Sequence, residues 1–136
     1  MSTTKINTAK KMDQNEFIQE ILSDYQLVCL SREASLLGRK EVLTGKAKFG
    51  IFGDGKELAQ IAMSKFFQNG DFRSGYYRDQ TFMMSIGKLS VSEFFAGLYA
   101  HTDPVKEPTS AGRQMGGHFS TKLLKESIAI RGISKV

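Results

Sequence analysis

The sequence predicts a mostly helical chain with one or two short strands. Apolar residues recur at helical spacing over much of the chain, which is typical of amphipathic helices. Two helical segments open with capping boxes, at Asp13 and at Ser90, each followed three positions later by a glutamate. Two other segments, 72–77 and 128–130, contain the aromatic or β-branched residues that favour strands. A length of 136 residues suits one domain.

The first predicted helix follows a flexible lead-in at residues 1–13 and has Asp13 as its N-cap. Two adjoining apolar stripes are expected on its packed face. These are Phe17, Ile21, Tyr25 and Val28, and beside them Ile18, Leu22, Tyr25 and Cys29. The pattern continues to Leu43 with a weak point at Gly38, and Gly45 is the expected stop.

A glycine-rich loop, GKAKFGIFGDG, is predicted at 45–55, and a second helix fits residues 56–68. The residues in register on this helix are Leu58, Ile61, Ala62, Lys65 and Phe66. Asn69-Gly70-Asp71 is expected to form the turn that ends it.

Further helices are expected over residues 78–87, ending at Gly87, and from Ser90 through Tyr99. The phenylalanines and four methionines are interpreted as core packing. These methionines are Met12, Met63, Met83 and Met84.

The stretch from His101 to Phe119 has two prolines and three glycines and keeps no apolar period, which predicts a long loop. The segment that follows it begins like a strand at Ile128 and Ile130. The sequence shows neither a helix to cover this strand nor a second strand to pair with it.

Composition narrows the class of protein. The net charge of +5 comes from charges spread along the chain, which favours a solvated surface over a nucleic-acid or membrane partner. No apolar run is long enough for a membrane helix, and the polar N-terminus lacks a signal-peptide core. Cys29 is the single cysteine, so we expect a cytoplasmic protein without an internal disulfide.

Arg78 is the first candidate for a binding residue. It follows an aromatic segment at the start of a predicted helix, where the macrodipole disfavours a lone cation. An anion bound there would stabilise both, and a guanidinium matches phosphate oxygens in a bidentate way. The residues alone also allow Arg78 to pair with Asp79 or Asp71 at the surface.

The segment 112–119, GRQMGGHF, is the second candidate. Its glycines allow a ligand or another chain to approach the backbone closely, and it offers a guanidinium, an amide and an imidazole. A flexible surface connector is the alternative. His118 could move a proton near neutral pH or be a hydrogen-bonded structural residue, and His101 is interpreted as structural.

Three segments in this order resemble the alpha subunit of thiamine-diphosphate-dependent 2-oxo acid dehydrogenases. They are GDGKELAQIAMSKFFQNGDFRSGYYRDQTFMMSIG, SVSEFFAGLYA and GRQMGGHFS. The family has a "GQEA"-like segment, a "PGD" turn and a Tyr-Arg-Glu or Tyr-Arg-Asp motif, matched here by residues 55–59, 69–71 and 77–79. The GRQM run is closer to the branched-chain type than to the pyruvate type.

The resemblance implies roles for individual residues. The tyrosine and arginine of the motif contact the diphosphate of the cofactor, a role carried over to Tyr77 and Arg78. Tyr76 would line the same pocket. Gln114 and His118 match the loop that runs towards the active-site region, so Gln114 is expected near the cofactor and His118 near the chemistry.

The resemblance also implies the rest of the enzyme. The intact subunit has an α/β thiamine-diphosphate-binding fold, and residues 14–136 correspond to its mostly helical N-terminal part. Its partners are a beta-type half or subunit and a lipoyl acyltransferase, which accepts the acyl group, and a homo-oligomer is expected. The chain is then a fragment that is inactive alone and exposes apolar helix faces.

Gly53-Asp54-Gly55 resembles the start of the magnesium motif of these enzymes. The motif closes about thirty residues later with paired asparagines, but Met83 and Met84 stand near that distance, so the second ligand is missing. The triplet is therefore interpreted as a plain turn, with magnesium bound by residues outside this chain.

Two alternatives stay open. One is a small basic module that binds nucleic acid or an acidic partner through Arg32, Arg39, Lys40, Lys46 and Lys48. The other is a related thiamine-diphosphate enzyme, such as an acetoin dehydrogenase, whose alpha subunit is built alike.

Overall fold

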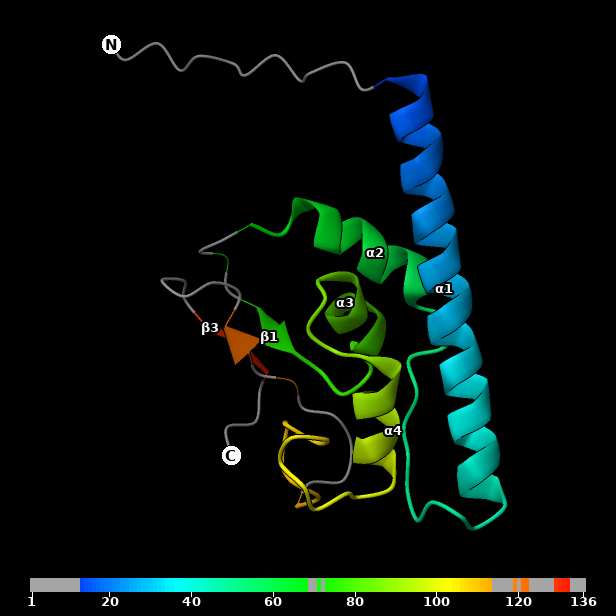
Figure 1. Ribbon diagram of the computed structural model, residues 1–136, viewed down its shortest axis with the longest axis vertical. Helices are drawn as coiled ribbons and strands as arrows, with labels where there is room; N and C mark the ends of the chain where they lie inside the picture. Colours follow the sequence, from blue (N-terminus) through cyan, green and yellow to red (C-terminus); the bar gives the residue numbers. More distant parts are fainter. Residues whose placement is uncertain are drawn as a thin grey trace.

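The computed structural model is mostly helical in the part of the chain that it describes (Figure 1). This part comprises residues 13–68, 71, 73–113, 119, 121–122 and 129–132. The helices are α1 (Gln14–Leu43), α2 (Glu57–Phe66), α3 (Gln80–Ser85) and α4 (Val91–Leu98). The strands are β1 (Ser74–Gly75), β2 (Thr121–Lys122) and β3 (Ala129–Gly132). The predicted lead-in before Asp13 and the turn at Asn69-Gly70 lie outside the described residues.

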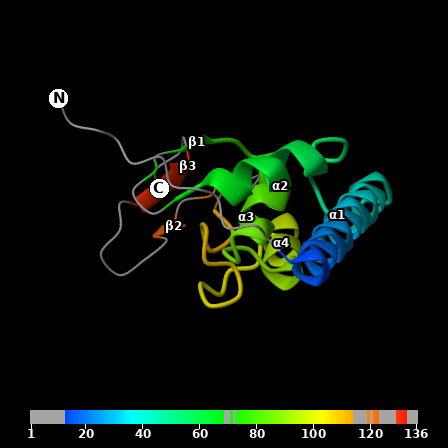
Figure 2. The same cartoon turned by 90° about the horizontal axis from the view of Figure 1, so that it is seen from above.

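The elements form three successive layers. The long helix α1 lies along one side, the shorter helices α2, α3 and α4 pack against it, and the strands lie beyond them (Figures 1 and 2). None of the helices in the described ranges combines the length and the apolar character that crossing a membrane requires.

The predicted ends of α1 are confirmed. The backbone N–H of Asp13 donates to the Glu16 carboxylate at 3.4 Å, as a capping box requires. At the other end Gly45 has φ = +77°, the left-handed conformation with which glycine commonly ends a helix.

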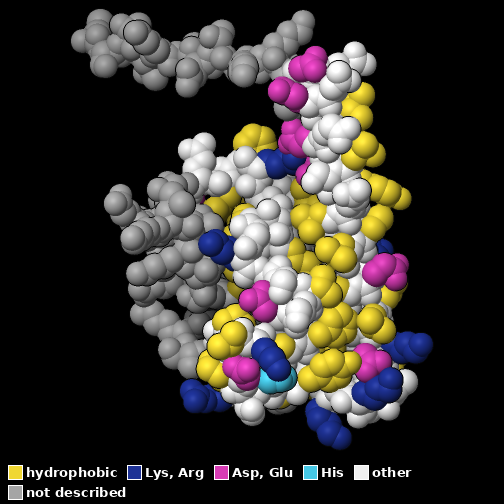
Figure 3. Space-filling model, in the orientation of Figure 1, with side chains coloured by type: hydrophobic (Ala, Val, Ile, Leu, Met, Phe, Trp, Pro, Cys, Tyr) yellow, Lys and Arg dark blue, Asp and Glu magenta, His cyan; other side chains and the backbone are white. Residues whose placement is uncertain are grey.

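The prediction for the packed face of α1 is wrong. Its buried residues are Ser31, Ala34, Ser35, Gly38 and Glu41. The predicted stripes are mostly exposed instead. Tyr25 is 65% accessible, whereas Val28 is half-buried. Apolar side chains line the outer edge of the helix (Figure 3). Small side chains let α1 approach its neighbours closely, and this leaves the large apolar ones outside. The expectation that apolar helix faces would be exposed is met.

Gly38 is not a weak point of the helix. The helix passes through it unbroken, and a Cβ at this position would lie 2.5 Å from Cε1 of Phe52. The absent side chain is what lets the Phe52 ring, on the loop after α1, lie against the helix.

Helix α2 packs through a face that shares only Ile61 with the predicted one. Its buried residues are Glu57, Gln60 and Ile61, whereas Leu58 is 73% and Phe66 81% exposed. Two of the three inward residues are polar because each has a hydrogen-bond partner on another element, and the apolar period alone could not show those partners.

The predicted helices around the motif segment are confirmed with shorter bounds. Gly87 follows α3 with φ = +68°, and the capping box of α4 joins Ser90 and Glu93. Met83 and Met84 lie in the core as expected, together with Phe82, Leu89 and Phe119. Met63, by contrast, is exposed, and Met12 lies outside the described residues.

The strand predicted near residue 128 forms, but the expectation that it would lack a partner is wrong. It is β3, and it lies between β1 and β2 in the order β1-β3-β2. It pairs in parallel with β1, with Ser74 opposite Arg131, and antiparallel with β2, with Thr121 opposite Ile130. The sequence around residue 128 could not reveal this pairing, because its parallel partner β1 is only two residues long.

Candidate functional site

The Tyr76–Asp79 segment forms a tight turn between β1 and α3. The backbone N–H of Asp79 donates to the carbonyl of Tyr76 at 3.1 Å. In return the Asp79 carboxylate accepts the backbone N–H of Tyr76 at 2.7 Å. This pair of hydrogen bonds closes the turn, so Tyr77 and Arg78 project from a defined backbone.

The three side chains of the turn are stacked. The rings of Tyr76 and Tyr77 lie 3.8 Å apart between centroids at an angle of 35°, and the hydroxyl of Tyr76 donates to that of Tyr77. This hydrogen bond raises the pKa of Tyr76. The Arg78 guanidinium carbon lies 5.6 Å from the centroid of the Tyr77 ring, a cation–π distance. The three residues thus lie together, whereas their predicted contact with a diphosphate stays a prediction.

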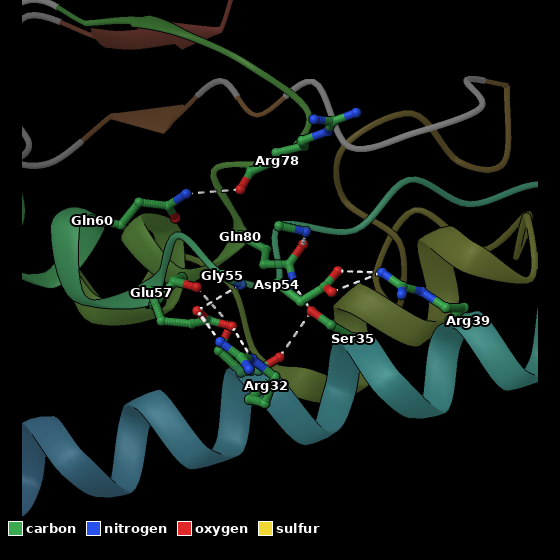
Figure 4. A network of polar contacts seen from close by, with 12 residues as sticks. Arg32, Ser35, Arg39, Asp54, Gly55, Glu57, Gln60, Arg78 and Gln80 are labelled. Atoms are coloured by element: carbon green, nitrogen blue, oxygen red, sulfur yellow. Dashed lines mark hydrogen bonds and ion pairs between the residues drawn. The ribbon is translucent and has the colours of Figure 1, made fainter.

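Arg78 has no ion pair with any carboxylate of the described ranges. Its Nε is buried and has no hydrogen-bond partner there. Asp79 does not pair with it, because that carboxylate binds Arg73, and Asp71 accepts a backbone hydrogen bond from Gln68. In Figure 4 the guanidinium points away from α1 and the polar network beneath it.

Two buried glutamines lie beneath the turn, and one of them, Gln60, holds the backbone of Arg78 (Figure 4). The Nε2 of Gln60 donates to the carbonyl of Arg78 at 2.9 Å. Gln80 accepts the backbone N–H of Gly53 at 3.1 Å and donates to the hydroxyl of Ser35 on α1. Neither glutamine was among the residues predicted from the sequence. Their only signal is a glutamine on an inward helix face, which requires a partner when buried.

The Gly53-Asp54-Gly55 triplet forms the predicted turn. Asp54 accepts two hydrogen bonds from Arg39, at 2.6 and 2.8 Å, and the N–H of Gly55 donates to Glu57. Glu57 also binds Arg32 through two hydrogen bonds, which lower the pKa of this carboxyl. In the described part of the chain no group of three or more acidic, histidine or cysteine side chains is placed to hold a metal.

A small pocket lies beside Tyr77, with a cavity volume of about 50 Å³. Its walls are mainly apolar and come from the loop before α2, from α4 and from the loop after α4. Examples are Phe49, Phe52 and Leu98. The buried carboxylate of Glu107 and the hydroxyl of Ser110 add polar groups on one side.

The remaining predicted residues fall into two groups. Gln114 and His118 lie outside the described residues. His101 has the expected structural role, because its Nδ1 accepts the backbone N–H of Asp103 at 3.1 Å.

Three of the five residues of the proposed basic module form ion pairs with carboxylates. Arg32 binds Glu57, Arg39 binds Asp54 and Lys46 binds Glu41. Ion-paired cations attract a phosphate backbone less than free ones, which argues against a nucleic-acid surface here.

The chain is similar to an enzyme subunit. It is 32% identical over 109 residues to the 2-oxoisovalerate dehydrogenase subunit alpha of Bacillus subtilis (strain 168). The match covers 76% of this chain but 31% of that relative, so the chain spans about a third of the relative's length. This likeness agrees with the resemblance carried by the motifs. No family model and no solved structure matches the chain.

Proposed function

We propose that this chain supplies part of the thiamine-diphosphate site of a 2-oxo acid dehydrogenase that acts on a branched-chain 2-oxo acid. In this proposal Tyr77 and Arg78 contact the diphosphate, and Tyr76 lines the same site. The observation that carries it is the Arg78 guanidinium, which has a fixed backbone and no carboxylate partner in the described ranges. A half-buried cation in that state is suited to an anionic ligand.

The residues of the turn fit a diphosphate. The Nε of Arg78 is a buried donor without a partner among the described residues, and the guanidinium fork matches two phosphate oxygens. The described ranges do not offer a comparable site for magnesium, because the carboxylate of Asp54 is ion-paired with Arg39. We therefore assign no metal ligand to this part of the chain.

Thiamine diphosphate, when bound, supplies the electron sink that the loss of carbon dioxide from a 2-oxo acid requires. The residues of this chain bind and orient. Gln60 fixes the carbonyl of Arg78, which aims its guanidinium, and the hydroxyl of Tyr76 fixes that of Tyr77. Preorganised donors of this kind bind an anion without further ordering of the site.

The proposal extends to partners. The relative is named as a subunit, which supports assembly of this chain with other subunits in general. We propose a beta-type half or subunit, a lipoyl acyltransferase that accepts the acyl group, and a homo-oligomeric arrangement, all in the cytoplasm. Gln114 and His118 keep their proposed places near the cofactor and near the chemistry.

Replacing Arg78 with alanine tests the cofactor site. We expect the dissociation constant for thiamine diphosphate, measured by isothermal titration calorimetry, to rise at least about tenfold. The reason is the loss of charged hydrogen bonds worth ~1.5–3 kcal/mol.

The matched control is Arg39→Ala, which removes an arginine that is paired with Asp54 away from the turn. It should bind thiamine diphosphate like the unaltered protein. Equal affinity in Arg78→Ala and the unaltered protein would remove Arg78 from the site and would contradict the proposed function.

Substitutions on the exposed outer edge of α1 test whether the protein forms a homo-oligomer through this helix. Leu22 and Tyr25 are 48% and 65% exposed there, and burying them between subunits would be favourable. We expect the double variant Leu22→Lys, Tyr25→Lys to sediment as a smaller species than the unaltered protein. The control is Leu58→Lys on α2, which is exposed but lies off this edge. Identical sedimentation of all three would rule out α1 as the contact.

A further inference from the structure

Arg73 lies directly beneath the turn that carries Tyr77 and Arg78. Only 7% of it is exposed, and its guanidinium forms an ion pair with the carboxylate of Asp79. The same carboxylate oxygen accepts the backbone N–H of Tyr76 at 2.7 Å. One acidic group therefore joins a buried cation to the first residue of the turn.

The burial of Arg73 is unfavourable in itself. Its Nε has no hydrogen-bond partner among the described residues. The guanidinium carbon lies 5.0 Å from the centroid of the Phe82 ring, and Nη2 donates to the sulfur of Met83 at 3.4 Å. Burial lowers the pKa of Arg73, and the attraction of Asp79 only partly opposes this. Apolar side chains often stabilise such a position at least as well as a buried ion pair. A role other than stability accounts better for an arginine here.

The backbone is shaped to admit this side chain. Gly75 lies against the guanidinium, and a Cβ at this position would come within 2.2–2.4 Å of three guanidinium atoms of Arg73. Any other residue at position 75 would displace the arginine from Asp79. Arg73, Gly75 and Asp79 therefore act together: Gly75 leaves room for the guanidinium that binds Asp79.

Asp79 is the immediate neighbour of Arg78 and is only partly buried. A carboxylate so close would be expected to pair with the Arg78 guanidinium if nothing else bound it. In the structure it binds Arg73 instead, and Arg78 has no ion pair with a described carboxylate. The two arginines therefore differ. Arg73 is ion-paired with Asp79, whereas the Arg78 guanidinium is left without a described carboxylate and can bind another anion.

We propose that Arg73 is a positioning residue, which holds Asp79 away from Arg78 and so keeps the Arg78 guanidinium available to a diphosphate. The ligand in this inference rests on the proposed function, whereas the competition between the two arginines for one carboxylate does not. A purely structural role for Arg73 makes a different prediction. If the role were purely structural, a second substitution that removes the charge of Asp79 would not restore the accessibility of the Arg78 guanidinium.

The first test needs no ligand. Phenylglyoxal modifies accessible guanidinium groups, and peptide mass spectrometry reports the rate at Arg78 in the full chain. We expect Arg73→Met to slow this modification roughly tenfold, because Asp79 then pairs with Arg78. The double variant Arg73→Met, Asp79→Asn should recover the original rate, since asparagine still accepts the N–H of Tyr76 but carries no charge.

The second test measures the binding of inorganic pyrophosphate and of thiamine diphosphate to the same proteins by calorimetry. Arg73→Met should weaken binding roughly tenfold, and the double variant should restore it to within about threefold. Lys65→Met is the control. It breaks ion pairs to Glu20 and Asp24 far from the turn, so it should lower thermal stability and leave both readouts unchanged.

The outcomes separate the two proposals. An unchanged modification rate in Arg73→Met, or a double variant that stays as slow as the single one, would overturn the positioning role of Arg73. Absence of thiamine-diphosphate binding to the unaltered protein, together with the expected modification rates, would instead contradict the proposed function and leave the competition for Asp79 established.

Discussion

Replacing Gly53 with alanine is expected to lower the free energy of unfolding by about 3 kcal/mol. The added Cβ would lie 2.3 Å from the carbonyl oxygen of Arg78, well inside van der Waals contact. That oxygen belongs to the backbone and is held by Gln60, so it cannot move aside without breaking a partly buried hydrogen bond. The N–H of Gly53 would also be displaced from Gln80.

Urea unfolding measures this effect, and Gly97→Ala is the matched control. A Cβ at Gly97 would meet its nearest atom, Cγ of Glu107, at 3.9 Å, which is an ordinary contact. Since Gly97 lies in α4, alanine there should stabilise the protein by up to ~1 kcal/mol through helix propensity. A Gly53→Ala protein as stable as the unaltered one would show that the Arg78 carbonyl is not fixed.

The ends of the helices could be predicted from the sequence because their signals are local. The capping boxes at Asp13 and Ser90 and the glycines that follow α1 and α3 act within a few residues of the chain. The faces that pack could not be predicted in the same way. A small residue such as Ala34 is buried because of the elements opposite it, and those elements are distant in the sequence.

The same distinction holds for the site. Tyr77 and Arg78 could be found because they are adjacent and belong to a motif of recognisable order. Gln60, by contrast, binds the Arg78 carbonyl from 18 residues away, and Gln80 binds Ser35 from 45 residues away. The pairing of Arg73 with Asp79 was missed for another reason: nothing in the sequence shows which of two nearby arginines obtains the carboxylate.

Glu107 organises the loop after α4, and its substitution is expected to cause the second large loss of stability. The residue is 3% exposed, and its carboxylate accepts four hydrogen bonds. The donors are the backbone N–H groups of Thr109, Ser110 and Gly112 and the hydroxyl of Ser110, at 2.9–3.0 Å. Burial alone would raise the pKa of this carboxyl, but the hydrogen bonds outweigh burial and lower it below its ordinary value of 4.5.

Replacing Glu107 with glutamine is expected to lower the free energy of unfolding at pH 7 by about 3 kcal/mol. The amide keeps one accepting oxygen, but its NH₂ group must face an N–H donor of the loop. The loop forms one side of the pocket beside Tyr77, so thiamine-diphosphate affinity should fall as well. Glu93→Gln is the control, because glutamine serves equally well in a capping box, and its stability should change little.

The pH dependence gives this prediction a second, independent measurement. Because the folded pKa of Glu107 lies below the unfolded one, its ionised form stabilises the protein fully above about pH 4.5. This stabilisation is lost as the pH falls through the folded pKa. The stability of the unaltered protein should therefore decline on acidification more steeply than that of Glu107→Gln, and the two curves should converge in acid. Parallel curves over the whole range would mean that the charge of Glu107 does not hold the loop.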